Sequence, residues 1–315
     1  MRGEWMESEI REQPALWAEH ANRYESEIRQ FVAGRSFDSV VVVARGSSDN
    51  AGLYARYLIE ISVGIPVVLA APSVLTRYGR RVRFGRTLAL GISQSGAGPD
   101  VSEVLQSIRE DGGATLAITN TEGSRITQAA EATLLLGLGE ERSIAATKSY
   151  TASLLAIYGL ARALGGDLPS TEGRLPGAEW VEHCHSVAMD QAGYLLRSSL
   201  VFLLARGIDF CTAHEAALKL MECALLPCKA YSRADFEHGP KAIAGPGTAT
   251  IVFGGDAWGL EQLGSLPVVA PSFSHDLLAP LGDIVFAQWL ALFAARARNL
   301  DPDRSEVLRK VTQTR

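Results

Sequence analysis

The sequence contains few cysteines and little excess charge of either sign. Only four of its 315 residues are cysteine, no two form a CxxC pair, and the first is Cys184. This scarcity argues against a disulfide scaffold or a structural zinc site and fits a reducing cytoplasm, the localisation we expect. With 30 Lys and Arg against 35 Asp and Glu, the formal net charge is −5. We therefore expect no nucleic-acid or membrane partner, although a local cationic pocket for a small anion stays open.

Long hydrophobic runs are absent as well. The first 14 residues are charged and have no apolar centre, so they do not read as a signal peptide. The longest apolar stretches, such as residues 284–295, are too short to span a membrane. The composition, 47% hydrophobic and 21% charged, is that of a globular protein, and the length suggests about two domains.

Short β-branched runs alternate with helical segments along the first half. An amphipathic helix is expected over residues 5–33, with an interruption at Pro14. Strands are expected at residues 39–44, 66–70, 87–92, 114–119 and 132–136. Helices are expected at residues 50–61, 100–111, 124–130 and 145–164. This alternation predicts a parallel sheet with helices on both faces.

The second half repeats the pattern of the first. An apolar run followed by Ala-Arg-Gly occurs at residues 41–46 and again at residues 201–207, about half the chain apart. Chance is the alternative explanation, but the shared tripeptide favours two similar α/β lobes. The elements expected after the Gly- and Pro-rich residues 165–173 are helices at 179–197, 213–226 and 282–299, an extended segment at 229–232, and strands at 249–254 and 266–270.

Hydroxyl-rich loops follow two of the expected strands. One is Gly46-Ser47-Ser48, and the other is Ser93-Gln94-Ser95-Gly96. In a parallel sheet both lie at the carboxyl edge, where free helix N–H groups and neutral side-chain donors can bind an anion. A single such loop is as well explained by serine as a helix N-cap. Two of them favour a phosphate or sugar-phosphate pocket.

A narrow charged stripe marks the helix expected at 213–226. Glu215, Lys219 and Glu222 lie at positions i, i+4 and i+7 of an otherwise apolar helix. A solvated stripe with a weak Glu–Lys pair is one interpretation. The other is a lined cleft in which a carboxylate transfers protons.

Histidine offers one further candidate. His238 precedes Gly239-Pro240, which places it at a turn or helix start where it can titrate near neutral pH. A surface or N-capping histidine is the alternative. His183 and His185 would point to different faces of their helix, so we expect no metal site.

Together these motifs resemble the double-SIS (sugar isomerase) family. The chain is similar to the isomerase half of glucosamine-6-phosphate synthase and to the stand-alone SIS-type glucosamine-6-phosphate deaminases. The resemblance rests on residues 44–50, 71–74, 92–100, 141–151, 215–222, 238–240 and 301–314.

The resemblance implies a role for each matched position. Glu222 would move a proton between C1 and C2, and His238 would open the sugar ring from across a dimer interface. Lys310 would close over the site with its tail, and the catalytic Lys219, together with Glu215, would support the open-chain sugar. The substrate and its phosphate would be held by Ser47, Ser48, Ser93, Gln94, Ser95, Ala145, Ala146, Thr147 and Glu215.

The resemblance also implies the architecture and the activity. We expect an N-terminal helix (1–35), a first SIS-like lobe (36–166), a linker and connecting helix (167–197) and a second lobe with the tail (198–315), each lobe a three-layer αβα sandwich. The implied enzyme is a cofactor-free deaminase or isomerase of a 6-phosphorylated amino sugar, acting as a homodimer with shared active sites. A phosphosugar aldose–ketose isomerase and a non-catalytic sugar-phosphate sensor are the alternatives.

The chain departs from the family pattern in three places. Gly98 stands where the family usually has Thr or Ser, which removes one phosphate hydroxyl, and Glu237 precedes His238. The segment between the expected strands 249–254 and 266–270 is shorter by roughly a helix and a strand. These departures bear on the edge of the second lobe and on the substrate.

Overall fold

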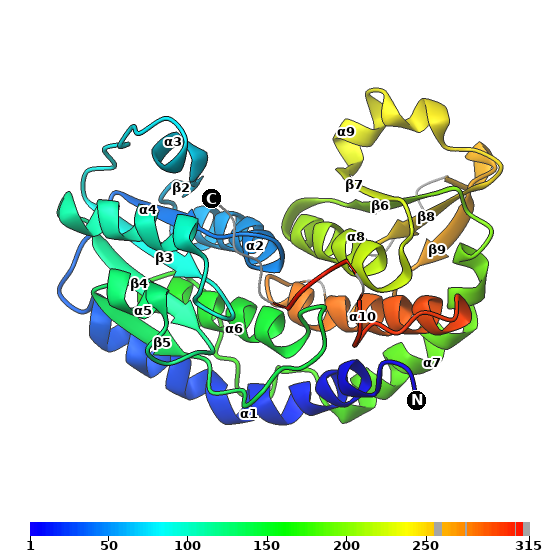
Figure 1. Ribbon diagram of the computed structural model, residues 1–315, viewed down its shortest axis with the longest axis horizontal. Helices are drawn as coiled ribbons and strands as arrows, with labels where there is room; N and C mark the ends of the chain where they lie inside the picture. The colour runs from blue at the N-terminus through cyan, green and yellow to red at the C-terminus, as the bar shows by residue number, and fades with distance from the viewer. Residues whose placement is uncertain (255–259, 275, 306, 311–315) are drawn as a thin grey trace. The chain divides into compact units, whose positions relative to one another are not determined.

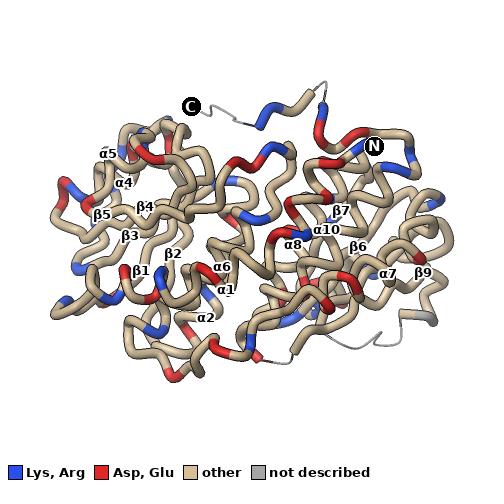
Figure 2. The backbone as a smooth tube through the Cα atoms, turned by 90° about the horizontal axis from the view of Figure 1, so that it is seen from below, with Lys and Arg blue, Asp and Glu red and all other residues tan. Residues whose placement is uncertain are grey.

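The computed structural model describes residues 1–254, 260–274, 276–305 and 307–310 (Figure 1). The chain forms two compact units, each with one parallel sheet. The first-sheet unit comprises residues 15–140 and 149–173, and the second-sheet unit comprises residues 1–14, 141–148 and 174–310. Acidic and basic residues are interspersed along the backbone of both (Figure 2), in keeping with the small net charge.

The first sheet has five parallel strands in the order β2-β1-β3-β4-β5. They are β1 (Ser39–Val43), β2 (Val67–Leu69), β3 (Thr87–Ile92), β4 (Ala114–Thr119) and β5 (Ala132–Leu135). The helices are α2 (Ser47–Ser62), α3 (Ser73–Thr76), α4 (Pro99–Glu110), α5 (Arg125–Ala129) and α6 (Lys148–Ala163). All six residues of β3 are buried, as expected for a strand covered on both faces.

Alternate residues of β1 face different helices. Val41 and Val43 belong to one core cluster with residues of α4 and α5. On the other face, Gly52 of α2 lies so close to Val42 that an added Cβ would be 3.0 Å from Val42 Cγ1. Since successive strand residues point to opposite faces, α2 and α4 cover opposite faces of the sheet.

The second sheet has four parallel strands in the order β7-β6-β8-β9. They are β6 (Leu200–Ala205), β7 (Cys228–Ser232), β8 (Thr248–Val252) and β9 (Leu266–Val269). The helices of this unit include α7 (Ala178–Leu195), α8 (Phe210–Ala224), α9 (Arg233–Glu237) and α10 (Ala279–Ala297). This order matches β2-β1-β3-β4, with Ala-Arg-Gly at the ends of β1 and β6. The predicted α/β fold with two similar parallel sheets is thereby confirmed.

The N-terminal helix α1 (Glu4–Val32) is continuous, so the predicted interruption at Pro14 is wrong. Proline lacks an N–H and leaves the carbonyl four residues earlier, that of Ile10, without its usual helical donor. The Gln13 side chain supplies one instead, because its Nε2 donates to Ile10 O at 3.1 Å. Gln13 Nε2 also donates to Gln288 Oε1 at 2.8 Å, which holds the amide in place.

Strand β9 lies at one edge of the second sheet. Ala270 N–H donates to Val252 O, and N–H groups alternate in direction along a strand, so those of residues 267 and 269 would point to the open edge. Residue 267 is proline and has no N–H. The short connection predicted between the last two strands lies partly outside the described residues, at 255–259.

None of the helices in the described ranges combines the length and the hydropathy that a membrane crossing requires.

Candidate functional site

The two hydroxyl-rich loops lie side by side in the first-sheet unit. They follow β1 and β3, which are neighbours in the sheet. From β1 the chain crosses to β2 on one side, and from β3 it crosses to β4 on the other, so this is where the strand order reverses. Ligands of open α/β sheets bind at the carboxyl ends of the strands at this point. Ser47, Ser48, Ser93, Gln94 and Ser95 are thus at one sheet edge, each partly accessible.

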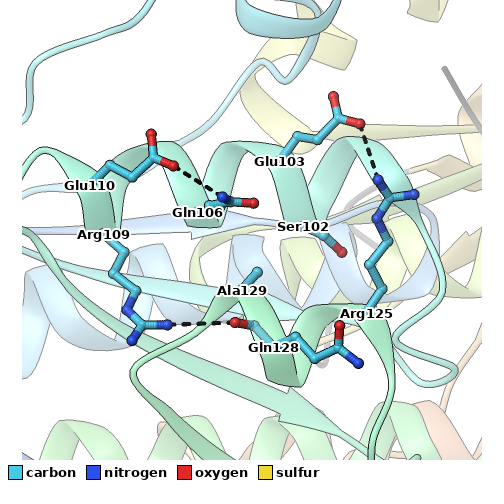
Figure 3. A pocket seen from close by; sticks show the side chains of 8 residues that line it. All are labelled: Ser102, Glu103, Gln106, Arg109, Glu110, Arg125, Gln128 and Ala129. Carbon is cyan, nitrogen blue, oxygen red and sulfur yellow. Dashed lines mark hydrogen bonds and ion pairs between the residues drawn. The ribbon is translucent and has the colours of Figure 1, made fainter.

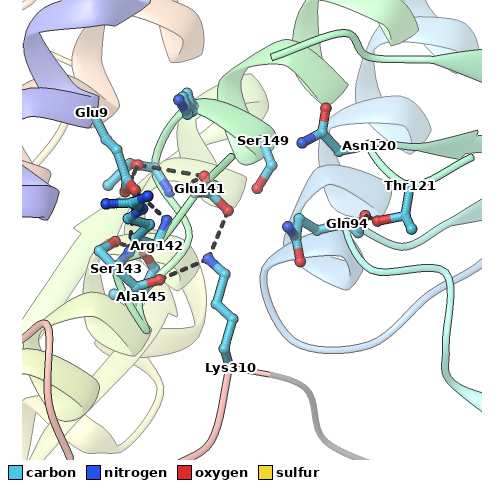
Figure 4. Close-up of polar contacts among 12 residues, drawn as sticks. Glu9, Gln94, Asn120, Thr121, Glu141, Arg142, Ser143, Ala145, Ser149 and Lys310 are labelled. Carbon is cyan, nitrogen blue, oxygen red and sulfur yellow. Dashed lines mark hydrogen bonds and ion pairs between the residues drawn. The ribbon is translucent and has the colours of Figure 1, made fainter. Parts of the chain in front are cut away.

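The loop after β3 is held by its own hydroxyls and by β4. Ser93 Oγ accepts from Gly96 N–H at 3.1 Å, and Ser95 Oγ is 3.4 Å from Ala97 N. Gln94 O accepts from the Thr121 hydroxyl at 3.3 Å, so the backbone is anchored while the Gln94 side chain extends from it (Figure 4). Gly96 has φ +61°, and a Cβ there would lie 2.1 Å from Ser124 Oγ. Only glycine fits this turn.

Helix α4 begins at Pro99, three residues after Gly96, and its N-cap is Gly98. Among the charged groups near this edge, Asp100 is buried and accepts from Arg45 Nε at 2.8 Å. Arg45 stands two residues after the end of β1, so this ion pair ties the first loop to the helix that follows the second. The matched motifs 44–50 and 92–100 contained one of these residues each, but their pairing required the fold.

The charged stripe on α8 is buried rather than solvated. The side chains of Glu215 and Lys219 are 1% and 0% exposed, and that of Glu222 is 24% exposed. Lys219 Nζ lies 2.6 Å from Glu222 Oε2 and 3.3 Å from Glu215 Oε1. The interpretation of a solvated surface pair is therefore wrong.

Lys219 remains a cation in this position. Burial by itself lowers the pKa of Lys219, but the carboxylates of Glu215 and Glu222 outweigh it, so the pKa lies above its usual value. The stripe thus presents a fixed ammonium beside a carboxylate that water or a small molecule can reach. Such a pair can orient a base toward a bound substrate.

His238 lies in the turn between α9 and the 3-10 helix Pro240–Ile243, as predicted, and it is exposed. Ser232 caps α9 by accepting from Asp235 N–H at 3.2 Å. Glu237 pairs with Lys241 at 2.7 Å.

The segment 141–148 of the second-sheet unit holds the predicted turn Ala145-Ala146-Thr147 and also receives Lys310. Ala145 and Thr147 are buried and Ala146 is half-buried. Lys310 Nζ donates to Glu141 Oε2 at 2.8 Å and to Ser143 O at 2.7 Å (Figure 4). The buried Glu9 accepts from Ser143 N–H at 3.1 Å. Neither Glu9 nor Glu141 was a predicted site residue, although Glu141 begins one of the matched motifs.

A separate groove of about 420 Å³ lies between α4 and α5 (Figure 3). The two arginines of this groove already have partners in the protein. Arg109 donates to the backbone oxygen of Ala130 at 3.0 Å, and Arg125 lies 3.5 Å from Glu103. None of the predicted site residues lines this groove.

In the described ranges, neither Cys223 nor Cys228 is an activated thiol, and the metal-ligating side chains form no cluster. Burial raises the pKa of Cys223 and of Cys228 to about 12, which suppresses the reactive thiolate. No group of three or more His, Cys, Asp or Glu side chains there is placed to hold a metal ion.

Comparisons with known proteins bear on the family and the fold of the chain. Residues 35–163 match the family model of the SIS domain. The chain is 29% identical to glutamine–fructose-6-phosphate aminotransferase [isomerizing] of Listeria monocytogenes, over 97% of this chain and 58% of that protein. It therefore spans somewhat more than half the length of that relative.

Two solved structures share the fold across nearly the whole chain. Glucosamine-6-phosphate deaminase of Thermotoga maritima matches with a TM-score of 0.77 at 24% identity, covering 95% of this chain and 100% of that one. Tagatose-6-phosphate ketose/aldose isomerase of Escherichia coli matches with a TM-score of 0.73 at 18% identity, covering 96% and 95%. At these identities the likeness shows a common fold.

Proposed function

We propose that the chain is an enzyme acting on a 6-phosphorylated amino sugar, because residues 35–163 match the SIS-domain model and the second sheet repeats the strand order of the first. The reaction is conversion of glucosamine 6-phosphate and water to fructose 6-phosphate and ammonia, or the ammonia-dependent reverse. The observation that carries this proposal is the Glu215–Lys219–Glu222 stripe, in which an accessible carboxylate lies 2.6 Å from a buried ammonium. The names of the similar proteins, which concern glucosamine and fructose phosphates, support the choice of substrate.

The proposed chemistry moves one proton. Glu222 takes the C2 proton of the open-chain amino aldose; the electron pair forms a C1–C2 double bond while the C1=O π pair moves to O1, which takes a proton from solvent to give an enolamine. The proton then returns to C1 as the nitrogen lone pair forms a C2=N bond and the nitrogen loses a proton to solvent, and water hydrolyses the resulting ketimine to the ketose and ammonia. The reaction needs a placed base, an acid for ring opening and an anchor for the phosphate.

Each requirement has a candidate. Glu222 is the base, and Lys219 Nζ lies 2.6 Å from its Oε2 and fixes its position. The hydroxyl-rich loops at the carboxyl ends of β1 and β3 are the phosphate anchor, because they combine backbone N–H groups with serine hydroxyls. His238 is the ring-opening acid, and its exposure is compatible with a role toward a second copy of the chain in a homodimer.

A phosphosugar aldose–ketose isomerase is the second candidate, because the same base serves that reaction and the fold is shared with such an isomerase. In that reaction no nitrogen leaves the sugar. A non-catalytic sensor is less well supported, since a binding protein has no need of a buried ammonium fixed beside an accessible carboxylate.

The test is an ammonia-release assay across a panel of 6-phosphorylated amino sugars, with ketose phosphate measured in parallel. Glu222→Gln should lower turnover by ~10²–10⁴-fold with little change in substrate affinity, since it keeps the side-chain volume and removes the proton acceptor. Glu182→Gln, which removes an exposed carboxylate paired with Arg11 at 2.8 Å, is the matched control and should behave as wild type.

The outcomes separate the candidates. Release of ammonia together with ketose, and exchange of the C2 hydrogen with solvent deuterium, support the deaminase. Interconversion of nitrogen-free aldose and ketose phosphates alone supports the isomerase. Binding without turnover or exchange supports a sensor, and full activity in Glu222→Gln would place the base elsewhere.

A further inference from the structure

The buried carboxylate of Glu141 accepts hydrogen bonds both from Lys310 and from the turn 145–147, which lies far from Lys310 in sequence. The Glu141 side chain is fully buried, and its Oε2 accepts from Lys310 Nζ at 2.8 Å. Its other oxygen, Oε1, accepts from Thr147 N–H at 3.1 Å (Figure 4). Lys310 also donates to Ser143 O at 2.7 Å. Glu141 is therefore the group through which Lys310 and the turn 145–147 are connected.

A second buried carboxylate organises the same segment. Glu9 Oε1 accepts from the backbone N–H groups of Arg142 and Ser143, and Glu9 Oε2 accepts from Thr147 Oγ1 at 3.2 Å. Burial, and next the negative charge of Glu141, raise the pKa of Glu9. Two carboxylates thus share one buried region, and Lys310 brings a positive charge to it.

We propose that Glu141 is a positioning residue that fixes the Lys310 ammonium. Through Glu141, binding of Lys310 against the segment 141–148 is coupled to the geometry of the turn Ala145–Thr147. This inference rests on the proposed function and on the roles that the resemblance implies for Lys310 and the turn 145–147 beside the substrate. A buried carboxylate is strongly destabilising unless a cation and hydrogen bonds satisfy it. Withdrawal of Lys310 therefore disturbs the carboxylate that also holds Thr147 N–H, and the turn is ordered fully only when the lysine is docked.

Glu141→Gln separates the two functions of the carboxylate. The amide retains a carbonyl oxygen that can accept from Thr147 N–H, but it loses the charge that attracts Lys310. Glu12→Gln is the matched control, because Glu12 pairs with Lys148 at 2.7 Å, at the other end of the same segment. It removes an ion pair from the segment without touching Lys310.

The first measurement is acetylation of lysine amines followed by mass spectrometry, which does not depend on activity. In Glu141→Gln the rate of Lys310 modification should rise at least about fivefold, while Lys241, which is paired with Glu237 in both proteins, stays unchanged as an internal reference. Glu12→Gln should leave Lys310 modification at the wild-type rate. An unchanged Lys310 rate in folded Glu141→Gln would overturn the proposal.

The second measurement is steady-state kinetics in a double-mutant cycle. Glu141→Gln and Lys310→Met should each raise the KM for the sugar phosphate by about tenfold or more, and the double variant should be no worse than either single one. Independent, multiplying effects would contradict the coupling. If Glu141→Gln does not fold, hydrogen exchange of the peptide 141–148 in Lys310→Met decides: faster exchange supports coupling and unchanged exchange refutes it. A wild type that turns over no amino-sugar phosphate would refute the proposed function, while the acetylation and exchange results would still test Glu141.

Discussion

Replacement of Lys219 tests whether the stripe on α8 is held by its charges. The Lys219 side chain is completely buried, with Glu222 Oε2 at 2.6 Å and Glu215 Oε1 at 3.3 Å. Lys219→Met keeps an unbranched apolar stem of similar length and removes only the ammonium. Glu215, at 1% exposure, is then left as a buried carboxylate without that cation.

The expected loss follows from the burial of the two carboxylates. Removing one partner of a buried ion pair typically destabilises a protein by about 3–5 kcal/mol. Because Glu222 is 24% exposed and can be hydrated, most of the loss arises at Glu215, and we expect a value near the lower end, about 3 kcal/mol. At roughly 2–4 °C per kcal/mol, the midpoint of thermal unfolding should fall by roughly 6–12 °C.

The assay is thermal and urea unfolding at pH 7, followed by circular dichroism. The double variant Lys219→Met/Glu215→Gln should recover most of the loss, since it removes the uncompensated charge as well. Lys241→Met is the control: its ion pair with Glu237 is exposed, and such pairs contribute about 0–1 kcal/mol. A Lys219→Met protein within 1 kcal/mol of wild type, or no recovery in the double variant, would refute the ion-pair account.

Three further predictions concern the phosphate loops, the assembly and a buried acid. Ser95→Ala should raise the KM for a phosphorylated sugar several-fold or more, since a hydrogen bond to a charged group contributes about 1.5–3 kcal/mol; equal binding of phosphorylated and unphosphorylated sugars by the wild type would contradict this. Mixing inactive Glu222→Gln and His238→Ala chains should restore some activity if His238 serves the partner's site, whereas mixed dimers without activity would place His238 in its own chain's site. Burial, reinforced by Asp209, raises the pKa of Asp283 well above its usual value, so its ionisation destabilises the fold as the pH rises above about 4. Asp283→Asn should therefore unfold at a higher temperature than wild type at pH 8 and at a similar temperature near pH 3.5; a difference that does not vary with pH would argue against this assignment.

The strands were predictable because their signal is local. Buried parallel strands are short runs of β-branched and apolar residues, and Ser39–Val43 and Thr87–Ile92 both appear as such in the sequence. The prediction failed at Pro14 for the opposite reason. The missing N–H of proline is visible in the sequence, but the donation from the Gln13 side chain to Ile10 O is visible only in the structure.

The same contrast applies to the candidate site. Helical periodicity placed Glu215, Lys219 and Glu222 on one stripe, but it left open whether that stripe is buried. Glu9 carried no signal of its own, because its bond to Ser143 joins residues 134 positions apart. Contacts at such separation depend on the packing of several elements and have no counterpart in local spacing.

The proline in β9 has a consequence for how copies of this chain can associate. An open sheet edge is a template on which the backbone of another molecule can pair, and exposed apolar side chains such as Leu266 and Val269, at 39% and 40%, add to that tendency. Pro267 removes one of the two outward N–H donors that the strand would otherwise offer. A foreign strand would find an incomplete ladder there, so Pro267 lowers the tendency of this edge to extend into the sheet of another molecule.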